Sequence, residues 1–467
     1  MSDRLPLFPP GTHVNRHGHL VVGGCDTVQV AAEFGTPLYL FDEDLLRAKC
    51  REFQTEFGQR YENVRVLYAC KAYVNAVIAR LMNEEGMGLD VVSGGELGIA
   101  HAARFPMGKV YLHGNNKSRA ELELALRWKV GRIVVDNLQE LAMLAGMVKE
   151  RGVQQDILLR INPGVDPQTH AYTATGAVDS KFGVPQAHTV RAVKAAMSAG
   201  GLNLLGLHFH IGSRIRETGP YAESVRFALG VAAEMKDKYG LETRELNVGG
   251  GYDVRYTLNE PWLPTAAYAE AITATIRQEC RRLKLELPRL VVEPGREIVA
   301  QAGVALYTVG VTKDIPGVRA YVSVDGGMAD NIRPALYQAR LEAVTANRMR
   351  ATLAGKVTIA GKFCESGDVL IHDIEMPALQ PGDILAVPGA GAYSLPESMN
   401  YNAFLRPPVV MVKDGQARLI RRRETLRDIT RCDVKTNNQE TTVKTPDATM
   451  AAVDTLLNRR IEHRTAD

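Results

Sequence analysis

The sequence has no pair of cysteines with CxxC spacing, although it contains six cysteines. Scattered single thiols predict neither a disulfide framework nor a zinc knuckle. The N-terminus also lacks the basic-then-apolar order of a signal peptide, and no uncharged apolar run is long enough to span a bilayer. We therefore expect a reduced, cytoplasmic protein.

An excess of charge of either sign is absent as well. The chain has 56 Lys+Arg against 53 Asp+Glu, a formal net charge of +3, so no overall attraction to nucleic acid or anionic lipid is expected. Its 467 residues are 45% hydrophobic and 23% charged, which is typical of a folded protein of two or three domains and excludes a disordered chain. The 42 glycines are an excess whose positions matter below.

Eight short apolar runs alternate with segments of helical spacing in the first two thirds of the chain. Each run is rich in Val, Ile, Leu or Tyr, as a strand buried on both faces should be. The runs begin at Arg65, Leu89, Val110, Ile133, Ile157, Gly206, Glu245 and Arg289. This alternation predicts an α/β fold with a (β/α)₈ barrel of the TIM type, and an open doubly wound sheet is the alternative.

The residue pattern changes at about residue 301, after which short runs rich in β-branched residues are separated by Gly, Pro and Asp. We predict a barrel over residues 43–300 and a discontinuous antiparallel β domain built from residues 1–42 and 301–429. Residues 430–467 form a C-terminal extension. Its apolar residues Met450, Val453, Leu457 and Ile461 have the spacing of a short amphipathic helix.

Residues able to do chemistry follow several of the predicted barrel strands, at the face where barrel enzymes place their sites. Lys71 follows the first run, and a lysine there is either a solvated cap or an amine able to form a Schiff base. Gly249, Gly250 and Gly251 follow the seventh run, where they form either a flexible turn or a cradle for a phosphate, with Ser213 as an added hydroxyl donor. Glu293 ends the eighth run as a carboxylate that needs a partner.

His208 and His210 lie two apart in the sixth run and so share one face of a strand. This spacing occurs in metal sites, and a barrel metallohydrolase is one interpretation. Against it, the eighth run ends near Arg296, whose charge would repel a metal ion. A purely structural histidine pair is the other alternative.

Together an amine, an imidazole, a phosphate cradle and a carboxylate are what pyridoxal 5'-phosphate requires. Lys71 would bond to the cofactor, the glycines would hold its phosphate, and His210 would lie against its ring. Glu293 would keep the ring nitrogen protonated. A carboxylate at that position favours a strong electron sink, as a decarboxylase needs.

Several motifs resemble the fold-type III pyridoxal-phosphate decarboxylases. They are YACKA around Lys71, HFHIGS, NVGGGYD, VVEPGRE, CESGD and GAY, in order over residues 15–428. HGNNKS, RINPGVDPQTHAYTATG and DSKFG are similar to the branch that converts meso-2,6-diaminopimelate to L-lysine. The resemblance implies a homodimer with an active site shared across the interface.

The resemblance also implies roles for individual residues. Gly295, Arg296 and Tyr393 would contact the cofactor, together with the residues named above. Arg296, Arg333, Tyr337 and Tyr393 would bind substrate. Cys364 would be the general acid and Glu365 a substrate ligand, both reaching in from the partner subunit. Tyr73 stands where the family often has asparagine, and we expect a packing difference there.

Three alternatives to this function remain open from the sequence. A sister decarboxylase would act on ornithine, arginine or carboxynorspermidine. A barrel metallohydrolase would use His208 and His210. A regulatory protein would bind the cofactor without releasing carbon dioxide.

Overall fold

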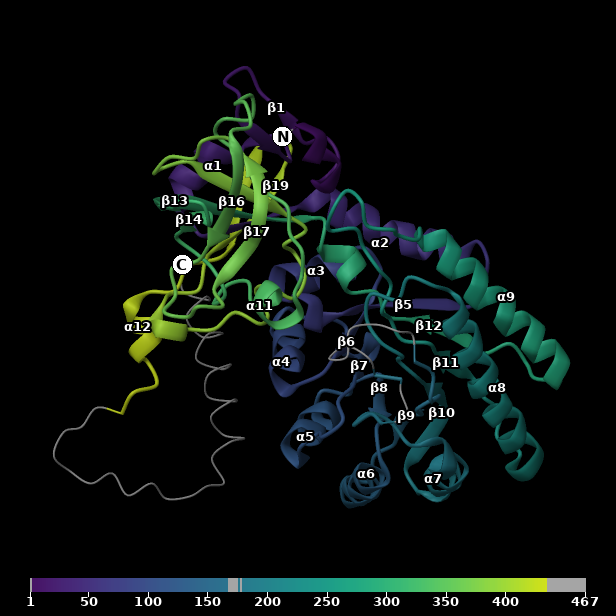
Figure 1. Cartoon of the computed structure of the whole chain (residues 1–467). Helices are drawn as coiled ribbons and strands as arrows, with labels where there is room; N and C mark the ends of the chain where they lie inside the picture. The colour runs from purple at the N-terminus through teal and green to yellow at the C-terminus, as the bar shows by residue number, and fades with distance from the viewer. Residues whose placement is uncertain (1, 167–174, 177–178, 435–467) are drawn as a thin grey trace.

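The computed structural model describes residues 2–166, 175–176 and 179–434. Eight parallel strands of this part of the chain close into a barrel through the pairing of the last strand with the first (Figure 1). They are β5 (Val64–Ala69), β6 (Gly88–Val91), β7 (Val110–Leu112), β8 (Arg132–Val135), β9 (Gln155–Arg160), β10 (Leu202–His208), β11 (Glu245–Asn247) and β12 (Arg289–Val292). The predicted barrel is thus confirmed, because a closed ring excludes the open doubly wound sheet.

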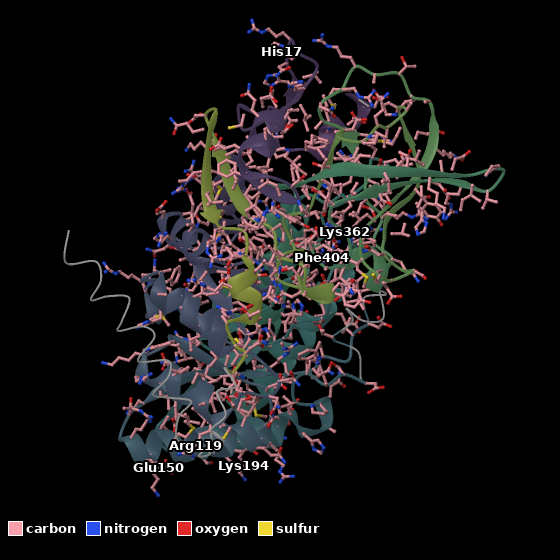
Figure 2. The ribbon with its side chains drawn as sticks, turned by 90° about the vertical axis from the view of Figure 1, so that its left-hand side faces the viewer. His17, Arg119, Glu150, Lys194, Lys362 and Phe404 are labelled. Atoms are coloured by element: carbon pink, nitrogen blue, oxygen red, sulfur yellow. The ribbon has the colours of Figure 1, made fainter. Side chains whose placement is uncertain are left out.

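Helices surround the barrel on its outer side (Figure 1). They are α2 (Glu43–Gly58), α3 (Ala76–Glu84), α4 (Gly94–Ala102), α5 (Arg119–Arg127), α6 (Leu138–Arg151), α7 (Gln186–Ser198), α8 (Gly219–Tyr239) and α9 (Thr265–Leu283). Several begin at a polar side chain that accepts from the first turn, such as Asn75, Ser93 and Asn137. At the outer surface, Arg119 of α5 pairs with Glu150 of α6 at 2.8 Å (Figure 2).

A second, mostly antiparallel sheet is built from segments on both sides of the barrel in the sequence. It contains β4 (Leu38–Asp42), β13 (Gly303–Ile315), β14 (Arg319–Val324), β15 (Val344–Thr345), β16 (Gly355–Ala360), β17 (Val369–Met376), β18 (Ile384–Pro388), β19 (Val409–Lys413) and β20 (Gln416–Arg421). β4 lies between β13 and β19, antiparallel to the first and parallel to the second. The N-terminal strand therefore joins the late strands, as the sequence predicts.

Short elements complete the described chain. The 3₁₀ helices are labelled η. Before β4 the chain forms the 3₁₀ helix η1 (Ser2–Leu7), a small sheet of β1 (His13–Val14), β2 (Leu20–Val22) and β3 (Cys25–Asp26), and the helix α1 (Thr27–Phe34). The others are η2 (Cys70–Ala72), η3 (Met107–Lys109), α10 (Arg296–Val299), α11 (Arg333–Tyr337), η5 (Tyr401–Ala403) and α12 (Leu426–Thr430). The helix predicted around Met450 to Ile461 lies outside the described residues.

The barrel interior is filled by its own apolar cluster, separate from the large core that packs strands on helices. The cluster takes one residue from each of six strands: Leu67, Tyr111, Val134, Leu158, Leu205 and Val291. Side chains alternate along a strand, so the intervening residues point outward to the helices. The filled interior leaves space for a site only at the ends of the strands. Among the described helices, none is both long and apolar enough to cross a membrane.

Candidate active site

A cavity of about 500 Å³ opens at the carboxyl ends of the barrel strands. It brings together residues from the barrel and from the second sheet that are far apart in the sequence. The predicted site residues that line it are Lys71, His210, Ser213, Arg296, Arg333, Tyr337 and Tyr393. Thr175, Arg214, Arg216, Glu260 and Glu397 are among its other lining residues.

Lys71 lies in the short turn η2 directly after β5, so the barrel wall fixes its backbone. Burial lowers the pKa of its amine, but the charges of Tyr393, Asp90 and Glu293 raise it more, and the net direction is upward. Tyr393 belongs to the second sheet's side of the cavity, and its backbone N–H donates to the carbonyl of Ala72 at 2.9 Å. This bond ties the two sides of the cavity together beside Lys71. Tyr393 has a left-handed φ of 58°, a rare conformation for a residue with a side chain.

Glu293 lies just below the cavity in a buried polar cluster. Asn247 donates to its Oε1 at 2.6 Å, and His113 Nε2 and His208 Nε2 approach its oxygens at 3.0 and 3.5 Å. Burial raises the pKa of Glu293, but His113 and His208 lower it far more, so the carboxylate is ionised. The sequence analysis expected a partner for the buried Glu293 carboxylate, and Asn247, His113 and His208 are such partners.

The two histidines of the HFH segment have different environments. His208 lies with His113, their ring centroids 4.8 Å apart, while His210 lines the cavity. Burial holds the pKa of His210 well below its ordinary value, and its Nδ1 accepts from Gly250 N–H at 3.1 Å. His210 is therefore neutral, with its proton on Nε2. Of the described residues, His208 groups with His113 and Glu293 as possible metal ligands, without His210.

The glycine loop after β11 is packed against its neighbours. A Cβ at Gly250 would lie 2.1 Å from the carbonyl oxygen of Glu293, so only glycine fits there. Gly249 N–H donates to Asn247 Oδ1 at 2.9 Å, and Gly250 N–H to His210. Close backbone approach is thus one reason for these glycines. Their predicted role as a phosphate cradle stays a prediction, and so does that of Gly251.

Two buried guanidinium groups also line the cavity. Arg296 donates to Ser213 Oγ at 3.0 Å and lies 4.5 Å from the centre of the Tyr393 ring. Arg333 is 4% exposed, and its Nη1 has no hydrogen-bond partner among the described residues. Tyr337 donates to Glu397 at 3.4 Å. A buried guanidinium that lines a cavity fits an anionic ligand.

Comparisons with known proteins agree with this geometry. A family model described as "Pyridoxal-dependent decarboxylase, pyridoxal binding domain" matches residues 43–300. Diaminopimelate decarboxylase of Bacillus subtilis (strain 168) is 46% identical over 431 residues, which cover 92% of this chain and 98% of the relative. This chain belongs to the pyridoxal-dependent decarboxylase family.

Solved structures of the family have the same architecture. Diaminopimelate decarboxylase from M. jannaschii in co-complex with L-lysine has a TM-score of 0.85 and 34% sequence identity, covering 91% of this chain and 98% of that one. The similarity therefore extends over the barrel and the second sheet together.

The two site residues that were predicted to come from a partner subunit do not line this chain's cavity. Cys364 and Glu365 follow β16 on an exposed loop. Cys364 N–H donates to Asn402 Oδ1 at 3.0 Å, and Tyr401 Oη donates to the Cys364 carbonyl at 3.2 Å. The single chain thus holds this loop in a defined shape outside its own cavity, and the role predicted for the two residues needs a second subunit.

Sequence reasoning gave no site role to three buried residues, Asp90, His113 and Tyr256. Asp90 lies within β6, near its carboxyl end, and His113 directly follows β7, which is the same kind of signal as that of Lys71 after β5. Tyr256 has no such signal, because it lies in the loop between β11 and α9. Its contacts with the arginines appear only in three dimensions.

Proposed function

We propose that this protein is a carbon–carbon lyase that decarboxylates meso-2,6-diaminopimelate to L-lysine and carbon dioxide, a step of lysine biosynthesis. The observation that carries the proposal is the 46% identity to a diaminopimelate decarboxylase over nearly the whole length of both chains. The cavity supports it, because Arg296 and Arg333 give two cationic groups to a substrate with two carboxylates.

Pyridoxal 5'-phosphate is the proposed cofactor, and the residues present fit it. Lys71 offers an amine, neutral His210 an imidazole for the ring face, and ionised Glu293 a partner for the ring nitrogen. Ser213, Gly249, Gly250, Gly251 and Gly295 would surround the phosphate, with Arg296 and Tyr393 beside them. When bound, the cofactor supplies an electron sink for the electron pair that departing carbon dioxide leaves behind.

The chain's own residues would bind and orient the substrate and move its proton. Arg333 and Tyr337 would hold the carboxylate that is retained, with Arg296 and Tyr393 at the reacting end. Cys364 Sγ would give a proton to the α-carbon after carbon dioxide has left, and Glu365 would bind the distal amine. Both would come from the partner subunit of a homodimer, since both lie on the exposed loop of their own chain.

We further propose that the chain divides into a barrel domain of residues 43–300 and a β domain of residues 1–42 and 301–429, followed by the extension. The placement of β4 in the sheet of late strands supports this division. The cytoplasm is the proposed compartment, because six unpaired thiols suit a reducing environment.

A substrate panel tests the function. The protein with pyridoxal 5'-phosphate is incubated separately with meso-diaminopimelate, ornithine and arginine, and carbon dioxide and product are measured. We expect L-lysine from diaminopimelate alone, and no product with the Lys71→Ala variant, which lacks the amine. Turnover of ornithine or arginine instead would identify a sister decarboxylase. Binding of the cofactor without carbon dioxide release would favour a regulatory protein.

A further inference from the structure

Tyr256 lies behind Arg296 and Arg333 and contacts both of them. Arg296 Nη1 donates to its hydroxyl oxygen at 2.7 Å. The guanidinium carbon of Arg333 lies 4.4 Å from the centre of its ring, and that of Arg214 lies 4.9 Å from it. Tyr256 is 3% exposed and is not one of the residues that line the cavity. It therefore acts on a bound molecule only through its arginine neighbours.

Electrostatics explains why a tyrosine suits this position. Two buried guanidinium groups repel each other, and burial together with the charges of Arg296 and Arg214 lowers the pKa of Arg333, while Tyr256 opposes the shift. Burial raises the pKa of the Tyr256 phenol, but Arg296, Arg333 and Arg214 outweigh burial, and the net direction is downward. The hydroxyl oxygen and the ring face thus each stabilise a different cation.

The surrounding chain holds Tyr256 in place. Glu260 accepts from the Tyr256 backbone N–H at 2.9 Å and from Arg214 at 3.0 Å. Asp253 accepts from Arg214 at 2.8 Å. From the other side of the cavity, Gly389 approaches so closely that a Cβ there would lie 3.0 Å from the ring. Contacts from both sides fix the tyrosine, and through it the directions of the two guanidinium groups.

We propose that Tyr256 is a positioning residue that orients Arg296 and Arg333 for the carboxylates of a dicarboxylic amino acid. The inference rests on the proposed function for the identity of that substrate. The side chains of Arg296 and Arg333 both line the cavity, so a ligand bound there can contact both guanidinium groups. Tyr256 accepts one N–H of Arg296 and contacts Arg333 through its ring, which leaves the other guanidinium N–H groups of both arginines for a ligand.

Tyr256→Phe and Tyr256→Leu separate the two contacts. The phenylalanine keeps the ring face and loses the oxygen, whereas the leucine loses both. We expect Tyr256→Phe to raise KM for meso-diaminopimelate by about 10-fold, the effect of one hydrogen bond to a charged group, with a smaller change in kcat. Tyr256→Leu should raise KM further. Calorimetry should give matching losses in affinity for meso-diaminopimelate and L-lysine.

Tyr61→Phe is the matched control, because it also removes a buried hydroxyl, one that donates to Pro288 at 2.7 Å near the amino end of β12. It should lose a similar amount of thermal stability and leave KM unchanged. Equal KM values for wild type and Tyr256→Phe would overturn the proposal, as would equal KM changes in Tyr256→Phe and Tyr61→Phe.

The calorimetry also separates this inference from the proposed function. If wild type releases no carbon dioxide from meso-diaminopimelate, the proposed function fails. The effect of Tyr256→Phe on binding of that compound still decides the inference: weaker binding supports it, and unchanged binding or no binding by wild type overturns it.

Discussion

At the scale of single residues, the buried cluster around Glu293 determines the charge below the cavity. Burial lowers the pKa of His113, but Asp90 and then Glu293 raise it more, so its net direction is upward. The pKa of Glu293 goes down through the same contact. Each partner thus favours the charged form of the other, and the ionised Glu293 is able to stabilise a protonated ring nitrogen.

His113→Gln tests this ion pair through the pH dependence of stability. A raised pKa in the folded state means that His113 stabilises the fold fully below about pH 6.5 and that the contribution is lost as pH rises through the folded value. Glu293, with a lowered pKa, contributes only above about pH 4.3. Removing one partner of a buried pair costs about 3 kcal/mol. Denaturant unfolding of wild type and His113→Gln should differ most between these two pH values.

The exposed His188→Gln on α7 is the control, with a change near zero at every pH. A stability difference for His113→Gln that grows as pH rises above about 6.5 would contradict the ionised pair.

Single residues also mark where sequence reasoning ends. Lys71, His210 and Glu293 were predictable because each directly follows a recognisable buried strand. The contact of His208 with His113 and Glu293 was not, since it depends on side chains that meet across strands. Tyr256 could not be identified from the sequence for the same reason, because its role depends on contacts with three arginines that are distant in the sequence.

At the scale of elements, the loop between β11 and α9 is shaped by backbone packing. Gly250 touches the chain that leaves β12, and Gly249 has a left-handed φ of 71°. The sequence indicated that three glycines at a barrel mouth would allow the backbone to come close to another group. It did not show that the approach is to neighbouring backbone, because that depends on the register of adjacent strands.

Gly250→Ala should destabilise the protein and weaken its hold on pyridoxal 5'-phosphate. A methyl group 2.1 Å from a carbonyl oxygen forces the loop to move, at a cost of about 2 kcal/mol. Denaturant unfolding and titration of the protein with cofactor measure the two effects. The matched control is Gly146→Ala on the exposed side of α6, where a methyl group meets nothing within 4 Å and should add up to about 1 kcal/mol of stability. Cofactor affinity unaffected by Gly250→Ala would show that the loop does not hold the phosphate.

At the scale of the whole molecule, the barrel and the second sheet together form the cavity. The loop that contains Cys364 is exposed and does not line it. Figure 2 shows Lys362 and Phe404 side by side next to this loop, with the ammonium 4.4 Å from the ring centre. The barrel order and the joining of both chain ends in one sheet were predictable, because strand patterns and chain order dictate them. A second subunit is implied only by the resemblance to the family.

Mixed dimers test the shared site. Lys71→Ala and Cys364→Ala subunits are each expected to be nearly inactive. After purification for both tags every dimer is mixed and contains one intact site out of two, so the sample should have about half of wild-type activity. Denatured and refolded mixtures of two tagged variants, purified for both tags, supply the sample. A confirmed mixed dimer without activity would contradict a site shared across the interface.

The proposed function requires that Lys71 in the barrel cavity bonds covalently to pyridoxal 5'-phosphate. Its most direct test is borohydride reduction of the protein loaded with pyridoxal 5'-phosphate, followed by peptide mass spectrometry. We predict one irreversible pyridoxyl group per chain, on the peptide that contains Lys71, and none at that position when meso-diaminopimelate saturates the site before reduction. A group attached to any other lysine, or none at all, would contradict the account.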